Sequence, residues 1–288
     1  MSKVFITGAS GGIGQRLKLA LEANGDEVIL PSQSSIRIED PTYFEGIATP
    51  EEIDVLYHLA AISFVPKSWE KPADFIRVNV LGATQVLEFC RKYHIKIVYV
   101  SSYAYGIPAY LPIDEKHPVS AANPYALSKI MGEDLCQFYG QNYGVNYTII
   151  RPFNVYGSID NKALLIPEII EQIRFGSEIN VQDLTPKRDY VFIDDFIRFL
   201  VQVQLDDSNE IYNIGSGISH SVAELIEICQ TVWGTDLPVL SKDIIRQNEI
   251  SETLCDAFKA KKRLGWEPEF SLEDGIRMMK IRIESNQG

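Results

Sequence analysis

The chain is poor in the residues that build metal centres and disulfide frameworks. Its 288 residues include four cysteines and four histidines, and no two cysteines stand in a CxxC or other metal-ligand spacing. The sequence therefore gives no ground for a zinc cluster. Met1 leads directly into a strand-like segment, so we expect no signal peptide, a reducing compartment and a cytoplasmic location.

Positive charge is also scarce. The chain carries 27 Lys and Arg against 39 Asp and Glu, a net charge of −12. Because phosphate contacts dominate the affinity of proteins for nucleic acids, a surface of this sign repels them on average. No apolar run approaches the roughly 18 residues that span a bilayer. We therefore expect no nucleic-acid and no membrane partner, although a few convergent arginines could hold a small anion.

The composition is otherwise that of a globular protein, with 45% apolar and 23% charged residues. In the first half, short β-branched runs alternate with helical patterns. We expect strands at 3–7, 27–30, 36–38, 54–59, 96–102 and 146–151, and helices at 12–24, at 125–143 and in a long segment ending near 93. Strands separated by helices form a parallel sheet, because parallel neighbours need a crossover connection. The sequence predicts an α/β fold with a doubly wound parallel sheet.

The pattern changes after residue 151, where prolines and glycines break the chain into shorter pieces. The expected elements are helices near 163–175, 193–204, 222–233 and 272–283, and a brief strand at 211–214. We therefore expect a smaller C-terminal α+β lobe. The predicted boundaries place 1–157 in the first domain, with a segment near 188–215 returning to it, and 158–187 and 216–288 in the lobe.

A glycine-rich loop separates the first expected strand from the first helix. Gly8 allows a tight turn, Gly11 lets the backbone approach a pyrophosphate, and Gly14 lets the helix pack on the sheet. The helix N-terminus adds free N–H groups and the positive end of a dipole. A flexible surface turn is the alternative, but the strand–loop–helix context is the one this motif requires. We expect a dinucleotide to contact Gly8, Ser10, Gly11, Gly12, Ile13 and Gly14.

The residues after the second strand bear on the choice of cofactor. An acidic residue there would accept hydrogen bonds from a ribose 2′-hydroxyl and favour NAD. The segment 30–35 reads LPSQSS and contains no acid. Ser32 and the nearby cations Arg16 and Arg37 could instead bind a 2′-phosphate. NADP(H) is therefore favoured, whereas NAD(H) stays possible if these serines only form a solvated turn.

A tyrosine and a lysine stand four residues apart at the start of an expected helix. Asn123 and Pro124 mark the helix start, so Tyr125 and Lys129 share one face. A phenol with a pKa near 10 is a poor acid or base at neutral pH, but an adjacent ammonium favours the phenolate. A solvated helix face is the alternative interpretation. The pattern gains weight because Ser101 and Ser102, at the end of an upstream strand, supply a neighbouring hydroxyl.

The GxxGxxG spacing, the strand-end serines and YxxxK, in this order, resemble the short-chain dehydrogenase/reductase superfamily. The resemblance implies a Ser/Tyr/Lys triad, with Tyr125 as proton donor. Counting from the strand selects Ser102 as the residue that bonds the substrate carbonyl, and counting back from Tyr105 selects Ser101; we favour Ser102. In related enzymes the position of Asn79 completes a tetrad and braces a water-mediated proton relay, although a buried structural amide is equally compatible with the sequence.

Motifs in the second half extend the resemblance over nearly the whole chain. The segments RPFNVYG at 151–157, RDYVFIDD at 188–195, YNIGSG at 212–217 and LGWEP at 264–268 resemble the extended members that act on nucleotide sugars. The resemblance implies that Asn154, Arg188 and Arg246 contact the substrate diphosphate. Two arginines and an amide are suited to this role, because charge-assisted hydrogen bonds to phosphate are strong.

The resemblance implies further contacts with both ligands. Asp40 matches the position near the adenine in the dTDP-4-dehydrorhamnose reductases, and the small residues after His58 leave room for a ribose, while His58 itself is expected to be structural. The additional cofactor contacts expected are Leu59, Ala60, Ala61, Tyr125, Lys129 and Pro152. The additional substrate contacts expected are Ser63, Ser102, Tyr103 and Tyr125.

The residues beside the serines narrow the reaction within this group. Dehydratases of the group need an Asp-Glu pair there and decarboxylases a Glu, whereas this chain has Tyr103 and Ala104. Epimerases use no acid pair, but they usually hold NAD and keep an acid after the second strand. We therefore expect an NAD(P)H-dependent reductase of an NDP-4-keto-6-deoxyhexose. The alternatives are an NAD-dependent NDP-sugar 4-epimerase and, less favoured because Tyr125 and Lys129 are both present, a non-catalytic cofactor-sensing protein.

Members of this type pair through a four-helix bundle, so a homodimer is expected. The helices concerned would be 72–93 and 125–143. The apolar residues proposed for the interface are Val86, Leu87, Phe89, Cys90, Leu135 and Phe138. They could equally face the sheet of their own chain.

Overall fold

The computed structural model describes residues 1–31, 37–158, 163–244 and 249–285. The chain divides into two compact units, each assembled from separated segments. The first unit contains Met1–Gly106, Pro118–Pro152 and Ile197–Asn213. The second unit contains Ile107–His117, Phe153–Phe196 and Ile214–Gly288.

A six-stranded sheet forms the centre of the first unit. Its strands, in spatial order, are β2 (Glu27–Ile29), β1 (Lys3–Thr7), β3 (Val55–His58), β4 (Lys96–Val100), β5 (Tyr147–Pro152) and β9 (Ile211–Ile214). The neighbours from β2 to β5 run parallel. The predicted doubly wound parallel sheet is therefore confirmed. The strand order reverses at β1, and a crevice at such a switch point is where open α/β sheets bind their ligands.

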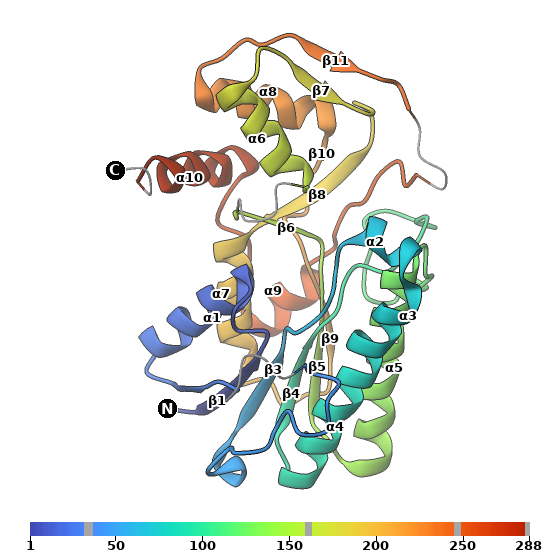
Figure 1. The fold of residues 1–288 in the computed structure, drawn as a ribbon, viewed down its shortest axis with the longest axis vertical. Helices are drawn as coiled ribbons and strands as arrows, with labels where there is room; N and C mark the ends of the chain where they lie inside the picture. Colours follow the sequence, from blue (N-terminus) through green and yellow to red (C-terminus); the bar gives the residue numbers. More distant parts are fainter. Residues whose placement is uncertain (32–36, 159–162, 245–248, 286–288) are drawn as a thin grey trace. The chain divides into compact units, whose positions relative to one another are not determined.

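Helices cover both faces of this sheet (Figure 1). On one face lie α1 (Gly12–Ala23) and α7 (Ile193–Val203), and on the other α4 (Gly82–Tyr93) and α5 (Pro124–Tyr143). The expected long helix ending near residue 93 is divided into α2 (Val65–Glu70), α3 (Pro72–Phe75), a π-helical segment η2 (Ile76–Leu81) and α4. A short 3-10 helix η1 (Pro50–Glu52) precedes β3.

The core of the first unit lies under α4 and α5. Val86, Leu87, Phe89 and Cys90 are buried there against residues of β1, β3 and β4. The proposal that these four side chains supply a dimer interface is therefore wrong, because the apolar face of α4 packs on its own sheet. Leu135 also packs against this core, although it is only partly buried.

The segment expected to form a strand at 36–38 takes another conformation where it is described. Ile38 lies in a turn, not a strand, and its buried side chain joins the core under α4. Residue 36 is outside the described residues. The sheet order β2-β1-β3 is complete without an additional strand from this segment among the described residues.

Where it is described, the second unit combines short strands with helices. Strands β10 (Ser219–Ser221), β8 (Lys187–Phe192) and β6 (Asn154–Tyr156) form one sheet, and β11 (Val239–Ser241) pairs with β7 (Ile179–Val181). The helices are α6 (Leu165–Phe175), α8 (Val222–Trp233), α9 (Phe258–Leu264) and α10 (Leu272–Ser285). The α+β character expected of this part is observed. Within the described residues, no helix of either unit is long and apolar enough to cross a membrane.

Candidate active site

Two glycines of the loop after β1 are required by the fold itself. Gly8 has φ +73°, and a Cβ there would lie 2.6 Å from the backbone nitrogen of Ala60. A Cβ on Gly14 would lie 2.4 Å from the carbonyl oxygen of Gly8. Gly11 is different, because its φ of −75° suits any residue and a Cβ would stand 3.4 Å from its nearest neighbour. The fold alone therefore does not explain a glycine at position 11.

The N-terminus of α1 has no side-chain cap. Gly11 is the N-cap residue, and no acidic side chain lies in the first turn. The first N–H groups of a helix have no intrahelical acceptor, and the aligned peptide dipoles make this end positive. Ser10 and Gly11 are exposed and Gly12 and Ile13 half-buried. This loop is therefore suited to hold the pyrophosphate of a dinucleotide.

The end of β3 borders the same loop. Thr7 Oγ1 lies 2.8 Å from His58 Nδ1 and accepts a 3.2 Å hydrogen bond from the Ala60 nitrogen. Burial, with a smaller effect of the Lys129 charge, lowers the pKa of His58 to about 3, so the ring is neutral and structural in character. Leu59 and Ala60 are half-buried and Ala61 is exposed, which leaves this edge accessible.

The residues proposed to select the cofactor are described only in part. Arg37 is exposed, with its guanidinium 3.9 Å from the Glu39 carboxylate. Asp40 accepts hydrogen bonds from the backbone and hydroxyl of Thr42, which lower its pKa. Ser32 lies outside the described residues. The preference for one dinucleotide over the other therefore stays a prediction.

The start of α5 positions Tyr125. Asn123 accepts a 2.8 Å hydrogen bond from the Ala126 nitrogen, and Pro124 occupies the first helical position, so the helix begins where the sequence predicts. The Tyr125 phenol forms a hydrogen bond with Ser102. Burial raises the pKa of Tyr125 to about 12, and the Ser102 bond opposes that rise. A hydroxyl and a phenol thus lie together at the carboxyl end of β4.

One turn further along α5, Lys129 is buried. Its Nζ lies 4.4 Å from the centre of the Tyr99 ring on β4. Burial lowers the pKa of the Lys129 ammonium to about 8, while the Glu133 carboxylate opposes this shift. A lysine in this state still supplies positive charge at neutral pH, and such a charge favours a neighbouring phenolate.

Asn79 lies in the π-helical segment η2 and is fully buried. Its Oδ1 accepts from the Ile62 nitrogen at 2.9 Å, and its Nδ2 donates to the Ile62 carbonyl at 3.0 Å and to Ser128 Oγ at 2.9 Å. Ser128 in turn donates to the Tyr125 carbonyl at 2.7 Å. Asn79 therefore links the loop after β3 to the first turn of α5. Its predicted part in a proton relay stays a prediction.

Ser101 makes a different set of contacts from Ser102. It is buried and donates a 2.5 Å hydrogen bond to Glu133 Oε1. Glu133 forms an ion pair with Arg151, which also bonds Tyr105. Glu133 was not among the site residues predicted from the sequence. The sequence feature that could have identified it is its position four residues after Lys129, which places both side chains on the same helix face.

The residues expected to bind substrate lie in both units. In the first unit, Ser63 is exposed and Tyr103 half-buried, and Pro152, which was predicted to contact the cofactor, ends β5. In the second, Asn154 Nδ2 donates to the Asp189 carbonyl at 2.9 Å. Arg246 lies outside the described residues.

Arg188 already has anionic and carbonyl partners in the second unit. Its guanidinium pairs with the Glu249 carboxylate and donates to the Ile250 carbonyl at 2.7 Å and to the Lys187 carbonyl at 2.8 Å. A diphosphate would therefore have to replace Glu249 at this guanidinium.

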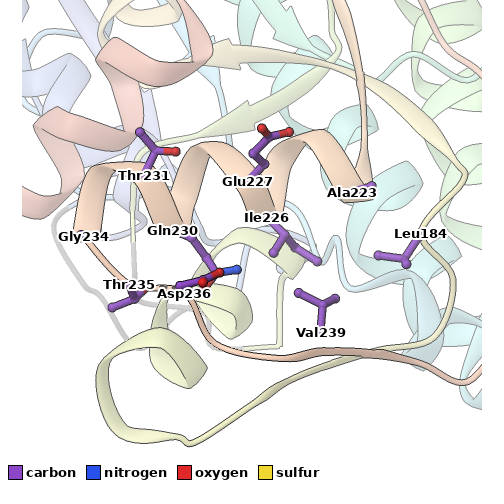
Figure 2. Close-up of a pocket in the computed structure, with 10 residues that line it drawn as sticks. All are labelled: Leu184, Ala223, Ile226, Glu227, Gln230, Thr231, Gly234, Thr235, Asp236 and Val239. Carbon is purple, nitrogen blue, oxygen red and sulfur yellow. Dashed lines mark hydrogen bonds between the residues drawn. The ribbon is translucent and has the colours of Figure 1, made fainter.

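The second unit also has a pocket beside α8 (Figure 2). It is lined by Leu184, Val239 and residues of α8 with the turn that follows, including Gln230. Gln230 bonds both the nitrogen and the carbonyl of Leu237, so its amide is committed to that turn. The pocket contains none of the predicted site residues. Among the described residues, no group of acidic, histidine or cysteine side chains is arranged to hold a metal ion.

Comparison with known proteins agrees with this arrangement. The model of the NAD dependent epimerase/dehydratase family matches residues 4–215. A candidate UDP-glucose 4-epimerase of Methanocaldococcus jannaschii is 34% identical over 98% of this chain and 99% of its own length. The GDP-6-deoxy-D-mannose reductase of Pseudomonas aeruginosa is 28% identical over 98% of this chain and 97% of its own.

The similarity extends to solved structures. RMD from Pseudomonas aeruginosa, complexed with NADPH, has a TM-score of 0.91 and 26% sequence identity to this protein. The match covers 99% of this chain and 100% of the other. Together with the glycine loop, the strand-end serines and the Tyr125–Lys129 pair, these matches show an enzyme of the extended short-chain dehydrogenase/reductase type, and the chain belongs to the NAD dependent epimerase/dehydratase family.

Proposed function

We propose that the protein reduces the 4-keto group of an NDP-4-keto-6-deoxyhexose. The observation that carries this proposal is the hydrogen bond between Ser102 and Tyr125, with Lys129 one turn further along α5. A reduced nicotinamide supplies the hydride when it is bound. Ser102 holds the carbonyl oxygen, on which negative charge develops, and Tyr125 donates a proton to that oxygen. The Lys129 ammonium stabilises the phenolate that remains.

The side chains beside Ser102 favour reduction or epimerisation over elimination. Tyr103 and Ala104 occupy the positions where an eliminating enzyme needs an acid and a base. Neither offers a carboxyl group, and an alanine cannot transfer a proton. The proposed chemistry is therefore limited to moving a hydride and one proton at a single carbon.

Asn154 and Arg188 are the proposed ligands of the nucleotide diphosphate. Both are half-buried residues of the second unit, and an amide and a guanidinium both donate to phosphate oxygens. The relatives named above support a nucleotide sugar as substrate, because both act on one by name. We accordingly propose that the first unit binds the dinucleotide and the second the nucleotide part of the substrate.

NADP(H) is the proposed cofactor. The uncapped N-terminus of α1 fits a pyrophosphate, and no acidic residue follows β2 in the segment 30–35. The neighbouring RMD structure contains NADPH. Isothermal titration with NADPH and NADH should show tighter binding of NADPH. Tighter binding of NADH would contradict this choice and favour the epimerase.

The activity is tested by mixing the protein with NADPH and a 4-keto-6-deoxyhexose carried on GDP, dTDP or UDP. We expect stoichiometric loss of NADPH absorbance and a 4-hydroxy sugar identified by NMR. The matched control is Tyr125→Phe, which keeps the ring but removes the proton.

An NAD-dependent NDP-sugar 4-epimerase is the second candidate. It is favoured by the 34% identity to the candidate UDP-glucose 4-epimerase. Given UDP-glucose, such an enzyme would invert the configuration at C4 with no net consumption of cofactor, so a second assay with UDP-glucose and the same NMR readout separates the two reactions. Turnover of either kind would exclude a non-catalytic cofactor sensor.

A homodimer is proposed through the outer face of α5. Leu127, Met131, Phe138 and Tyr143 are all exposed apolar or aromatic residues of this helix. The ring centres of Phe138 and Tyr143 lie 5.9 Å apart, and exposed apolar side chains that cluster in this way mark interaction sites. Light scattering should give twice the monomer mass, and Phe138→Glu should shift it to the monomer. A wild-type monomer at micromolar concentration would refute the dimer.

A further inference from the structure

A buried carboxylate on α5 takes no direct part in the proposed chemistry. Glu133 follows Lys129 by one helical turn and Tyr125 by two, so the three side chains share one face of the helix. Only 2% of the Glu133 side chain is exposed. A buried charge is costly unless hydrogen bonds or an opposite charge compensate it. The partners of Glu133 therefore show which parts of the chain it connects.

Both oxygens of Glu133 are engaged by Arg151. The Arg151 Nε lies 3.1 Å from each oxygen, and Nη2 lies 2.6 Å from Oε2. This arrangement is the two-point contact that gives arginine–carboxylate pairs their fixed geometry. Burial opposes the charge of the guanidinium, but Glu133 raises the pKa of Arg151 above its ordinary value. The pair is therefore a charged, rigid connection between α5 and β5.

The connection continues to the ends of neighbouring strands. Arg151 Nη1 donates a hydrogen bond to the Tyr105 hydroxyl at 2.9 Å, and the Tyr105 hydroxyl donates to Asn213 Oδ1 at 2.5 Å. Ser101, one residue beyond β4, donates to Glu133 Oε1 at 2.5 Å. Glu133 is the point at which α5, β5 and the carboxyl end of β4 are joined.

This junction lies directly beside the proposed reacting groups. Ser101 precedes Ser102, and Ser102 is the residue bonded to Tyr125. Holding the Ser101 side chain on the Glu133 carboxylate limits how the next residue can move. The geometry of the Ser102–Tyr125 contact therefore depends on a group two turns away on α5.

Glu133 also acts on Lys129 through its charge. The groups that interact with Lys129 are Glu133 and Cys136 on its own helix, Tyr99 on β4 and His58 on β3. His58 is neutral, as its lowered pKa requires, and burial raises the pKa of the Cys136 thiol and of the Tyr99 phenol. Glu133 carries the carboxyl group of this set, and its charge opposes the effect of burial on Lys129.

We propose that Glu133 is a positioning residue for the reaction at Tyr125. Through Ser101 and Arg151 it fixes the carboxyl end of β4 next to Tyr125, and its charge lies one helical turn from Lys129. The inference rests on the proposed function of Ser102, Tyr125 and Lys129. It also assigns Ser101 a supporting part, distinct from contact with the substrate.

The test is the double variant Glu133→Gln/Arg151→Met, which removes both charges and approximately conserves side-chain volume. We expect kcat to fall by about 10²-fold, the loss associated with displacement of reacting groups by about 1 Å, while KM for NADPH changes less than about threefold. The alkaline limb of the kcat–pH profile should move to lower pH, because Lys129 loses its proton more readily without the nearby carboxylate.

The matched control is Glu273→Gln/Arg277→Met, which removes an exposed Glu–Arg pair on α10. It should leave kcat and the pH profile unchanged. A Glu133→Gln/Arg151→Met protein that folds, binds NADPH and keeps both the wild-type kcat and the wild-type pH profile would overturn the inference.

A second variant covers the case in which the double variant does not fold. Ser101→Ala keeps the Glu133–Arg151 pair and removes only the hydrogen bond to the strand end. We expect kcat to fall several-fold with an unchanged pH profile, and an unchanged kcat would refute the positioning of β4 by Glu133.

A measurement without substrate separates this inference from the proposed function. In protein labelled with 15N-lysine, the Lys129 signal is identified from its loss in Lys129→Met, and its titration is followed by NMR. The pH at the midpoint of the Lys129 titration should be lower in Glu133→Gln than in the wild type. It should be unchanged in Glu273→Gln. An unchanged midpoint in Glu133→Gln would refute the electrostatic part of the inference, even if no 4-keto sugar is reduced by the wild type.

Discussion

Ser101 Oγ donates a 2.5 Å hydrogen bond to Glu133 Oε1, so two residues separated by 32 positions are joined in the interior of the first unit. The neighbouring Ser102 bonds Tyr125 instead. Successive side chains of an extended segment point to opposite sides, which explains why the two serines meet different partners. The Ser101 hydroxyl is committed to a buried carboxylate, and Ser102 is the better candidate to meet a substrate carbonyl.

The first prediction compares these serines. Ser102→Ala should lower kcat by about 10²-fold, the usual cost of losing one hydrogen-bond donor to a developing oxyanion. Ser101→Ala should lower it only several-fold, because the substrate oxygen keeps its donor. Steady-state kinetics of both variants with a 4-keto nucleotide sugar measures the difference, and a larger loss for Ser101→Ala would reverse the assignment.

The second prediction concerns Tyr125. Tyr125→Phe keeps the ring, which packs edge-on against Phe75, but removes the acidic hydroxyl. The expected loss in kcat is about 10²–10⁴-fold, as for a general acid, with little change in KM. Tyr93→Phe, at the half-buried C-terminal end of α4, is the control and should retain full activity. Near wild-type turnover in Tyr125→Phe would remove the basis of the proposed mechanism.

A third prediction separates the structural glycines from the ligand-facing one. Gly8→Ala should destabilise the protein by roughly 1–3 kcal/mol, because its Cβ meets the Ala60 backbone at a positive φ. Gly11→Ala should cost about 1 kcal/mol or less, since its backbone is extended and uncrowded, yet should weaken NADPH binding at least about tenfold. Thermal unfolding and titration calorimetry measure the two effects, and full NADPH affinity in Gly11→Ala would place the pyrophosphate elsewhere.

A fourth prediction concerns the buried Lys96 at the start of β4. Its ammonium donates to the carbonyls of Val203 at 3.1 Å, Gln204 at 3.0 Å and Asp206 at 2.5 Å, at the C-terminal end of α7. Lys96→Met should lower the free energy of unfolding by roughly 1–3 kcal/mol, because these carbonyls lose a charged donor that also matches the negative end of the helix dipole. Urea unfolding of the wild type and of Lys96→Met measures this change in the free energy of unfolding. The exposed Lys92→Met is the control, and equal stabilities of the two variants would contradict this explanation.

Several elements whose signals lie within a few neighbouring residues were predicted correctly from the sequence. The helix 222–233 was predicted with the bounds that the structure has, and a capping box of Ser221 and Glu224 explains the sharp start. The strand at 211–214 was also confirmed. The strands of three residues in the second unit, such as β6 and β10, were not predicted, because so few residues cannot show a period of two.

Packing decided what the apolar faces of the helices cover. Val86, Leu87 and Cys90 form an apolar face of α4 that could pack against a second copy or against the chain's own sheet, and the structure buries it in the core. Phe138, proposed for the same interface, is instead exposed. Hydrophobic periodicity identifies the face of a helix that is buried, but it does not show whether that face packs on the same chain or on a second copy.

The sequence by itself determined the glycine loop, the spacing of Tyr125 and Lys129 on one helix face and the alternation that produces a parallel sheet, because each depends on interactions within a few residues. Only the tertiary structure showed that Glu133 meets Arg151 and Ser101, and that Arg188 is paired with Glu249. These contacts join residues 18, 32 and 61 positions apart. Such pairs cannot be predicted from the properties of neighbouring residues. They form between distant segments, and only after folding has removed water from both charged groups.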